Sequence, residues 1–202
     1  GGTGSTRGGD HKSKGGREGA VYKRTAAKAE KWVAQVGGKA APTPKAAAEG
    51  QDVVMCCVGN DNDLREVTLG ANGAFAGMGK GKIFVDHTTA SADIARELYA
   101  AGQKAGFDCI DAPVSGGQAG AENGVLTVMC GGDAEPFVRA EKVIAAYARA
   151  CNLLGNPGSG QLTKMVNQIC IAGLVQGLAE GIHFAKKSGL DIEKLIATIS
   201  KG

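Results

Sequence analysis

The hydrophobic pattern alternates between two kinds of segment along most of the chain. Continuous apolar runs bounded by turn residues are typical of strands buried on both faces, and they predict strands at 20–22, 52–58, 82–86, 107–111, 125–130 and near 151–154. Segments rich in strong helix formers lie between them, at 26–36, 44–49, 61–69, 92–105 and 136–147. Alternating strands and helices predict an α/β fold with a doubly wound, mostly parallel sheet.

The alternation stops after Asn156, where a different pattern begins. Residues 161–187 contain no proline and place apolar side chains on nearly every side of a helix, which predicts a long buried helix. Residues 191–200 are again helical. We therefore expect two domains, a nucleotide-binding domain over 1–156 and the beginning of a helical domain over 157–202.

Lys164 and Asn167 are the candidate chemical groups of the long helix. Their spacing places them on the same face, one turn apart. Burying a lysine beside an asparagine is costly unless something uses the pair. The ordinary alternative is a lysine that keeps its amine in water at the helix start, although a cation there opposes the helix dipole.

The carboxyl ends of parallel strands are where ligands bind in such sheets, and here they are small or polar. Lys23-Arg24-Thr25 follows the first predicted strand, where an acid would hold the ribose 2′-hydroxyl of NAD and an arginine would accommodate the 2′-phosphate of NADP. A solvated basic turn is the alternative. Ser115, Gly116 and Gly117 follow a later strand, and their successive amides can form a nest for a carboxylate. A tight turn without a ligand is the alternative.

Composition excludes several other classes of protein. Aromatic residues make up only 4% of the chain, which argues against stacking platforms for single-stranded nucleic acid, and a net charge of +3 does not suggest a polyanion partner. The six cysteines match neither a disulfide framework nor a zinc site, and the three histidines form no cluster, so no metal is expected. No hydrolase triad is evident. We see no run suited to spanning a membrane and expect a cytoplasmic protein.

Three motifs resemble the β-hydroxyacid dehydrogenase family, of the 3-hydroxyisobutyrate dehydrogenase or 2-hydroxy-3-oxopropionate reductase type. DAPVSGGQAGAENGVLTVMCGG (111–132) resembles its substrate loop, and GSGQLTKMVNQ (158–168) resembles the start of its catalytic helix. VDHTTAS (85–91) also matches in order and spacing. The resemblance covers about residues 20–202. It implies a Rossmann-like domain, a helical domain, and hydride transfer between NAD(P) and a short 3-hydroxy acid or its semialdehyde, such as 3-hydroxyisobutyrate or tartronate semialdehyde.

The same resemblance implies a role for each matching residue. Lys164 would be the general acid/base and Asn167 would hydrogen-bond the substrate. The substrate carboxylate would be held by Ser115, Gly116 and Gly117. The residues that would line the cofactor are Gly1, Gly4, Lys23, Arg24, Thr25, Val58, Gly59, Asp63 and Thr89. Lys23-Arg24-Thr25 is similar to the Asn-Arg-Thr of relatives that prefer NADPH, so NADP is slightly favoured over NAD. The resemblance also suggests a homodimer or homotetramer.

Two departures from the family pattern stand at the ends of the sequence. The family begins with a hydrophobic strand and a G-x-G-x-x-G loop, whereas GGTGSTRGG (1–9) follows no strand and matches that loop only in part. The family also continues through a complete helical domain. We therefore expect the sequence to be part of a longer enzyme, with an intact mass above 20.4 kDa.

Other functions stay open at this point. The first is a non-catalytic NAD(P)-binding module that acts in protein interaction, which would not need both Lys164 and Asn167. The second is an imine reductase, although those enzymes lack the lysine. The third is a nucleic-acid binder based on the basic residues 1–24, of which 1–18 are glycine-rich.

Overall fold

The computed structural model describes residues 19–202, so the predicted cofactor residues Gly1 and Gly4 lie outside the described residues. The chain divides into two compact units, Gly1–Lys164 and Met165–Gly202. Each unit is described by itself below.

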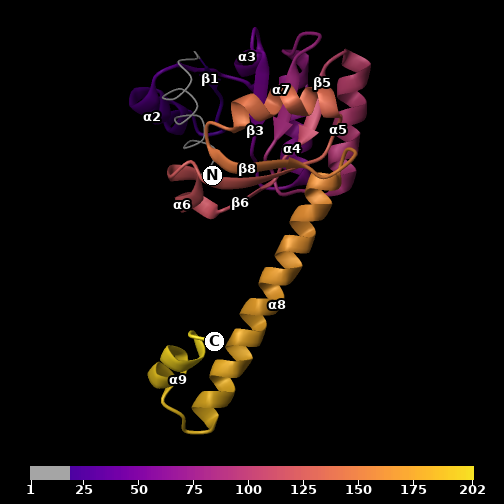
Figure 1. Ribbon diagram of the computed structural model, residues 1–202. Helices are drawn as coiled ribbons and strands as arrows, with labels where there is room; N and C mark the ends of the chain where they lie inside the picture. The colour runs from indigo at the N-terminus through magenta and orange to yellow at the C-terminus, as the bar shows by residue number, and fades with distance from the viewer. Residues whose placement is uncertain (1–18) are drawn as a thin grey trace. The chain divides into compact units, whose positions relative to one another are not determined.

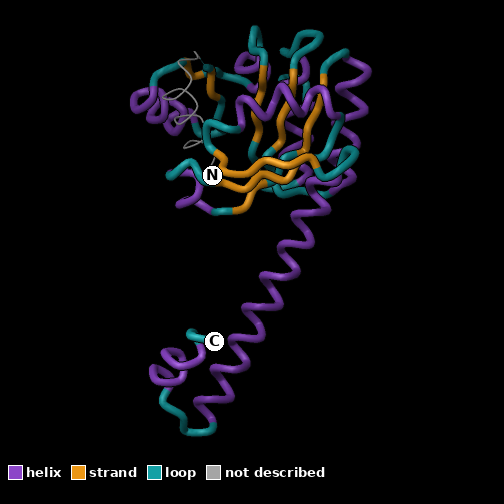
Figure 2. The backbone as a smooth tube through the Cα atoms, in the orientation of Figure 1, coloured by secondary structure: helices purple, strands orange, loops and turns teal. Residues whose placement is uncertain are grey.

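The first unit is an α/β fold whose strands form small, mostly parallel sheets (Figures 1 and 2). The strands are β1 (Ala20–Val21), β2 (Lys39–Ala40), β3 (Val53–Cys56), β4 (Ile83–Asp86), β5 (Asp108–Asp111), β6 (Val114–Ser115), β7 (Leu126–Cys130) and β8 (Ala148–Leu153). The sheet orders are β1-β2, β3-β4-β5 and β6-β7-β8, and only the β6–β7 pair is antiparallel. The predicted fold class is confirmed.

Helices connect these strands. They are α2 (Ala26–Val36), α3 (Pro44–Ala48), α4 (Asp61–Leu69), the short 3-10 helix η1 (Ala74–Ala76), α5 (Ala92–Ala105), α6 (Gly117–Glu122) and α7 (Ala134–Ile144). The predicted bounds of α2, α4 and α5 are those observed. Part of the reason is local, because Asn60 and Ser91 accept hydrogen bonds from backbone amides in the first turns of α4 and α5.

Two apolar clusters cover opposite faces of the β3-β4-β5 sheet. Ile83 and Val85 of β4 belong to the cluster that includes side chains of α7, whereas Phe84 packs with side chains of α4 and α5. Successive side chains of a strand point to opposite faces, so a fully buried strand such as β4 requires cover on both. This arrangement is doubly wound, with helices on each side of the sheet (Figure 1).

Three short elements depart from the predicted pattern. The strands β2 and β6 have only two residues each, and α6 lies in a stretch where no regular element was predicted. Two-residue strands carry no periodicity that a sequence could show. Glycines at the start and in the middle of α6 lower its helix propensity, which explains why the pattern did not indicate a helix there.

The long helix α8 (Ser159–Lys187) begins in the first unit and continues into the second, which also contains α9 (Ile192–Ile199). The prediction of a buried helix is wrong for most of its length, because Ile169, Leu174 and Phe184 are each at least 70% exposed. Burial is confined mainly to its start, where Gln161 and Lys164 are buried. An apolar helix surface indicates that other residues or another molecule pack against it. The pattern does not show whether those residues lie within this sequence.

The expectation that no segment is suited to spanning a membrane also needs correction. Among residues 19–202, α8 is long and apolar enough to cross a membrane by length and composition, and none of its most apolar window is buried. The apolar composition of α8 does not distinguish a membrane-spanning helix from a helix in the core of a larger protein assembly, because both are long and apolar.

Candidate functional site

The loops that follow β3 and β4 meet at the carboxyl edge of the parallel sheet. The backbone N–H of Val58 donates to the Thr88 hydroxyl over 3.1 Å, and the Thr88 N–H donates to a carboxylate oxygen of Asp86 over 2.9 Å. The first bond joins the two loops, and the second holds Thr88 in place after the end of β4. They leave the predicted cofactor residues Gly59 and Thr89 exposed at this edge.

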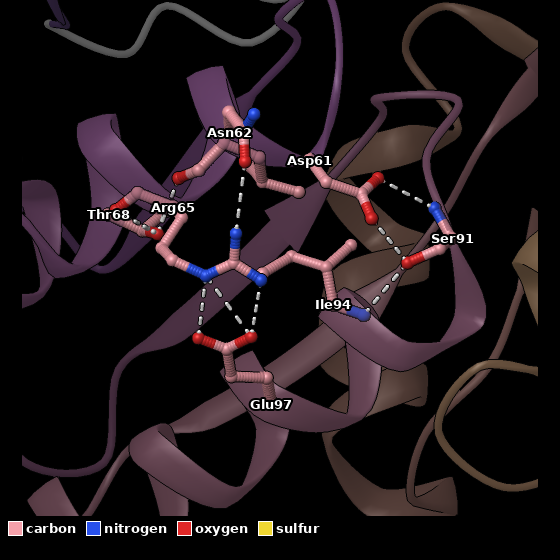
Figure 3. Close-up of polar contacts among 8 residues, drawn as sticks. Asp61, Asn62, Arg65, Thr68, Ser91, Ile94 and Glu97 are labelled. Atoms are coloured by element: carbon pink, nitrogen blue, oxygen red, sulfur yellow. Dashed lines mark hydrogen bonds and ion pairs between the residues drawn. The ribbon is translucent and has the colours of Figure 1, made fainter.

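The helices that leave these loops are tied together at their first turns (Figure 3). The Asp61 carboxylate of α4 accepts hydrogen bonds from the Ser91 N–H (2.9 Å) and from the Ser91 hydroxyl (2.5 Å), and these bonds lower the pKa of Asp61. The Ser91 oxygen in turn accepts from the Ile94 N–H and caps α5. One turn further along, Arg65 of α4 pairs with Glu97 of α5 over 2.7 Å. The geometry of this edge is therefore set by side chains as well as by the sheet.

Arg24 and Asp63, two of the predicted cofactor residues, lie in contact. An Nη atom of Arg24 lies 3.1 Å from Oδ1 of Asp63, although 39 residues separate them in sequence. Lys23 is partly buried, and this burial lowers its pKa. Thr25 is exposed at the start of α2. The structure thus places the segment after β1 beside the first turn of α4.

The predicted carboxylate nest lies where β6 ends and α6 begins. Ser115 is in β6, opposite Thr127 of β7, and Gly116 is the N-cap of α6. Gly116 and Gly117 both have positive φ, at 127° and 62°, a conformation that glycine adopts without strain. Both glycines are exposed, so their backbone is open to a small ligand.

Lys164 lies in the second turn of α8 and is only 8% exposed. Burial lowers the pKa of its amine, because the charged form loses solvation. Asn167 follows one turn later, in the second unit, where its side-chain amide donates to Gln168 over 3.0 Å. The predicted role of Asn167 stays a prediction.

Asp111, which the sequence-based candidates did not include, anchors the start of α8. Its carboxylate accepts hydrogen bonds from the backbone N–H groups of Gly158 (2.8 Å) and Gln161 (3.0 Å). Burial raises the pKa of Asp111, and these amides oppose that rise. A buried strand that ends in aspartate is a sequence signal for such an anchor, because the carboxylate must find donors.

Gln161 fastens the same turn to the edge described above. Its side-chain oxygen accepts from the Ala90 N–H over 3.0 Å, and its nitrogen donates to the Thr88 carbonyl over 2.7 Å. Gln161 is 1% exposed, so both of its polar atoms are satisfied inside the protein. Asp111 and Gln161 together hold the turn before Lys164 against the ends of β4 and β5.

His87 serves as a buried hydrogen-bonding residue beneath this edge. Its Nδ1 lies 2.6 Å from the Ala112 carbonyl and its Nε2 lies 2.7 Å from the Tyr147 hydroxyl. Because a carbonyl only accepts, Nδ1 carries a proton and donates it to Ala112. Within the described residues, no group of three or more His, Cys, Asp or Glu side chains is arranged to hold a metal ion.

Comparison with known proteins assigns the chain to a family. A model of the NAD binding domain of 6-phosphogluconate dehydrogenase matches residues 10–155. A model of the NAD-binding domain of NADP-dependent 3-hydroxyisobutyrate dehydrogenase matches residues 158–202. An uncharacterized oxidoreductase of Shewanella frigidimarina is 62% identical over 192 residues, covering 95% of this chain and 66% of that protein.

Two further proteins that are similar to this chain are named as 3-hydroxyisobutyrate dehydrogenases. The probable 3-hydroxyisobutyrate dehydrogenase-like 2 of Arabidopsis thaliana is 42% identical over 166 residues, covering 82% of this chain and 55% of that protein. The structure of Mycobacterium tuberculosis 3-hydroxyisobutyrate dehydrogenase with L-serine aligns with a TM-score of 0.90 at 27% identity, covering 100% of this chain and 68% of that one.

The fold and the matched models define an α/β nucleotide-binding protein of the NAD-binding class. More specifically, the chain belongs to the β-hydroxyacid dehydrogenase family, as its motifs predicted. It spans 66% of the Shewanella relative and 55% of the Arabidopsis relative, so about half to two thirds of their lengths.

The residues at the carboxyl edge fit a nicotinamide nucleotide. Lys23, Arg24 and Thr25 offer two cations and a hydroxyl, the donors that a phosphate or a ribose requires. At Gly59 a Cβ atom would come within 2.9 Å of the Asp63 carboxylate, so glycine keeps this loop open to close approach.

Proposed function

We propose that the protein is an NAD(P)-dependent oxidoreductase that acts on a short 3-hydroxy acid or its semialdehyde. The observation that carries the proposal is the placement of Lys164. A buried amine occupies the second turn of a helix whose first turn is bonded to the strand ends where nucleotides bind in this fold. Burying a lysine costs free energy, and a catalytic role accounts for keeping it there.

Lys164 acts as the general acid/base in this proposal. When the hydroxy acid is oxidised, the neutral amine accepts the proton of the substrate hydroxyl, and when the semialdehyde is reduced, the ammonium returns that proton to the carbonyl oxygen. The bound nicotinamide supplies the hydride acceptor or donor. Burial lowers the pKa of Lys164, which suits a group that must both accept and donate a proton.

The other residues bind and orient. The backbone amides of Ser115, Gly116 and Gly117 hold the substrate carboxylate, and Asn167 hydrogen-bonds the substrate beside Lys164. Val58, Gly59 and Thr89 contact the cofactor at the strand ends. Fixing the carboxylate orients the carbinol carbon before the chemical step, which is where positioned substrates gain rate.

Turnover measurements with and without Lys164 test this proposal. NADH and NADPH oxidation is followed with tartronate semialdehyde, methylmalonate semialdehyde and succinic semialdehyde for the purified protein, for Lys164→Ala and for Lys186→Ala. Removing the general acid/base should lower kcat by about 10²–10⁴-fold. The exposed Lys186 of the same helix is the matched control and should leave kcat unchanged.

A different result favours a different function. Cofactor binding without turnover in the unmodified protein, for every semialdehyde, would favour a non-catalytic NAD(P)-binding module. Equal loss of turnover in the Lys164 and Lys186 variants would remove Lys164 from the mechanism.

We also propose that copies of the chain associate with each other as a dimer or tetramer. The support is the resemblance to the family together with the exposed apolar side chains of α8. The experiment that tests self-association is given in the Discussion.

A further inference from the structure

We propose that Asp63 determines which nicotinamide cofactor the protein prefers, by holding Arg24 and by presenting a carboxylate to the adenosine ribose. This inference rests on the proposed function only in requiring that a nicotinamide nucleotide binds at this edge. The basic segment after β1 favours NADP when it is considered alone. The structure adds an acid to that segment from another part of the chain.

The contact between the two side chains is two-pronged. The two Nη atoms of Arg24 lie 3.1 Å and 3.5 Å from the two carboxylate oxygens of Asp63. Paired contacts of this kind fix the plane of the guanidinium group as well as its position. The same planar fork is what an arginine offers to a phosphate, so a cofactor 2′-phosphate and Asp63 compete for the same donors.

Asp63 is the better-fixed member of the pair. Its side chain is 21% exposed, whereas that of Arg24 is 67% exposed. Asn60 caps α4 by accepting from the Asp63 N–H over 2.9 Å, and the Asn60 amide nitrogen lies 3.5 Å from an Asp63 carboxylate oxygen. The neighbouring Asp61 is held by Ser91, so it is not the acid that meets Arg24. Arg24 can thus move toward a ligand more readily than Asp63 can withdraw.

The two cofactors meet this carboxylate differently. A ribose 2′-hydroxyl, as in NAD, can donate a hydrogen bond to it, which is the role of the acid that follows the second strand in many nucleotide-binding domains. A 2′-phosphate, as in NADP, must draw Arg24 away from Asp63 while its own negative charge lies near the carboxylate. Asp63 therefore supplies the acid that Lys23-Arg24-Thr25 lacks, and it offsets the preference for NADP that this basic segment gives.

Binding measurements test the inference without relying on turnover. Dissociation constants for NAD⁺, NADP⁺, 5′-AMP and 2′,5′-ADP are measured by calorimetry on the unmodified protein and on Asp63→Asn, Asp63→Ser and Arg24→Gln. The two fragments isolate the 2′-phosphate from the rest of the cofactor. Thermal unfolding of each variant establishes that it is folded.

The neutral Asp63 variants should bind the ligands that carry a 2′-phosphate more tightly, by about three- to tenfold relative to the ligands that lack it, as expected for one partly screened charge. The ratio of the NAD⁺ dissociation constant to that of NADP⁺ should fall in Arg24→Gln, the opposite of its change in the Asp63 variants. Glu66→Gln removes the same charge one turn further along α4 and is the matched control. It should change the ratio much less, because screening weakens the effect of a more distant surface charge.

Two outcomes would overturn the inference, and they differ in what else they affect. Unchanged ratios in both Asp63 variants, or an equal shift in Glu66→Gln, would remove Asp63 as a determinant and leave the proposed function intact. Failure of the unmodified protein to bind any of the four nucleotides would overturn the proposed function and this inference together.

Discussion

The amine of Lys164 is placed where its charge is poorly solvated. Burial lowers its pKa, so the protonated form is less favourable in the folded chain than in the unfolded chain. Between the lowered pKa and the ordinary value of 10.5, the unfolded chain binds more protons than the folded one. The free energy of unfolding should therefore rise as the pH increases through that interval.

Replacing Lys164 by methionine should remove this pH dependence and raise stability. Below the folded-state pKa the wild-type protein carries the full cost of the buried ammonium, whereas Lys164→Met does not. We expect Lys164→Met to gain about 0.5–2 kcal/mol at neutral pH, as is common when a functional residue is replaced by one that suits its surroundings. Urea unfolding at successive pH values from 7 upward measures the difference.

Lys186→Met serves as the control, because this lysine is exposed and should leave the pH dependence of stability unchanged. A wild-type protein whose unfolding free energy is flat between pH 7 and 10, or falls there relative to Lys164→Met, would contradict the inferred burial cost. A gain in stability together with the loss of turnover would indicate that the lysine is retained for function.

At the scale of single elements, the first turn of α8 is the part that the rest of the site depends on. Asp111 accepts from the backbone N–H groups of Gly158, immediately before the helix, and of Gln161 in its first turn, and helix N-termini favour such negative partners. The turn is also packed tightly, since a Cβ atom at Gly160 would collide with the backbone carbonyls of Met129 and Asp111. The position of Lys164 follows from these contacts rather than from helix propensity.

Asp111→Asn tests the importance of this anchor. The amide replaces one acceptor oxygen by an NH₂ group that faces backbone donors, which leaves buried polar atoms unsatisfied. We expect a loss of about 1–3 kcal/mol in the free energy of unfolding. Asp93→Asn is the control, because Asp93 is an exposed helix residue whose side chain is 93% accessible, and it should change stability by less than about 0.5 kcal/mol. Chemical denaturation measures the free energy of unfolding of both variants. Equally small losses in the two variants would mean that Asp111 does not anchor α8.

The sequence predicted the regular elements well where hydrophobic period and capping residues agree. α4 and α5 have the expected bounds because Asn60 and Ser91 cap them. β3 is apolar throughout, and the centres of β4 and β5 are apolar. β2, β6 and α6 could not be predicted, since two-residue strands and a glycine-rich turn of helix have no distinctive pattern.

The candidate site was predictable as a set of loops but not as a set of contacts. The rule that ligands bind at the carboxyl ends of parallel strands identified the segments around Arg24, Gly59 and Thr89. It could not reveal that Arg24 pairs with Asp63 across 39 residues, or that Gln161 bonds to Ala90, because such pairings depend on side-chain positions in the folded chain. The catalytic and binding roles remain predictions.

At the scale of the whole molecule, the second unit exposes many large apolar side chains. Leu174, Val175 and Phe184 of α8 and Ile199 of α9 are all more than half exposed. Exposed apolar patches of this kind mark surfaces that further protein or another molecule covers, and the composition of α8 would also suit a lipid bilayer. The family match over residues 158–202 is the reason to expect protein rather than lipid as the cover.

We therefore expect purified chains to associate with each other through α8. Light scattering after size-exclusion chromatography should give a mass of at least two copies, because covering several large apolar side chains stabilises an interface by about 25 cal/mol per Å² of apolar surface before association costs. The double variant Leu174→Gln, Phe184→Gln should lower the association constant by at least tenfold. Val125→Gln with Val138→Gln, which alters exposed valines of the first unit, is the matched control.

Flotation with phosphatidylcholine vesicles separates the two explanations for the apolar surface of α8. If chains that remain associated in buffer do not float with the vesicles, protein covers α8. If the chain is monomeric and floats, and Leu174→Gln with Phe184→Gln abolishes flotation, then α8 meets lipid and the proposed self-association is wrong. The proposed catalytic role of Lys164 would survive that result, because the contacts that place Lys164 lie entirely within the first unit.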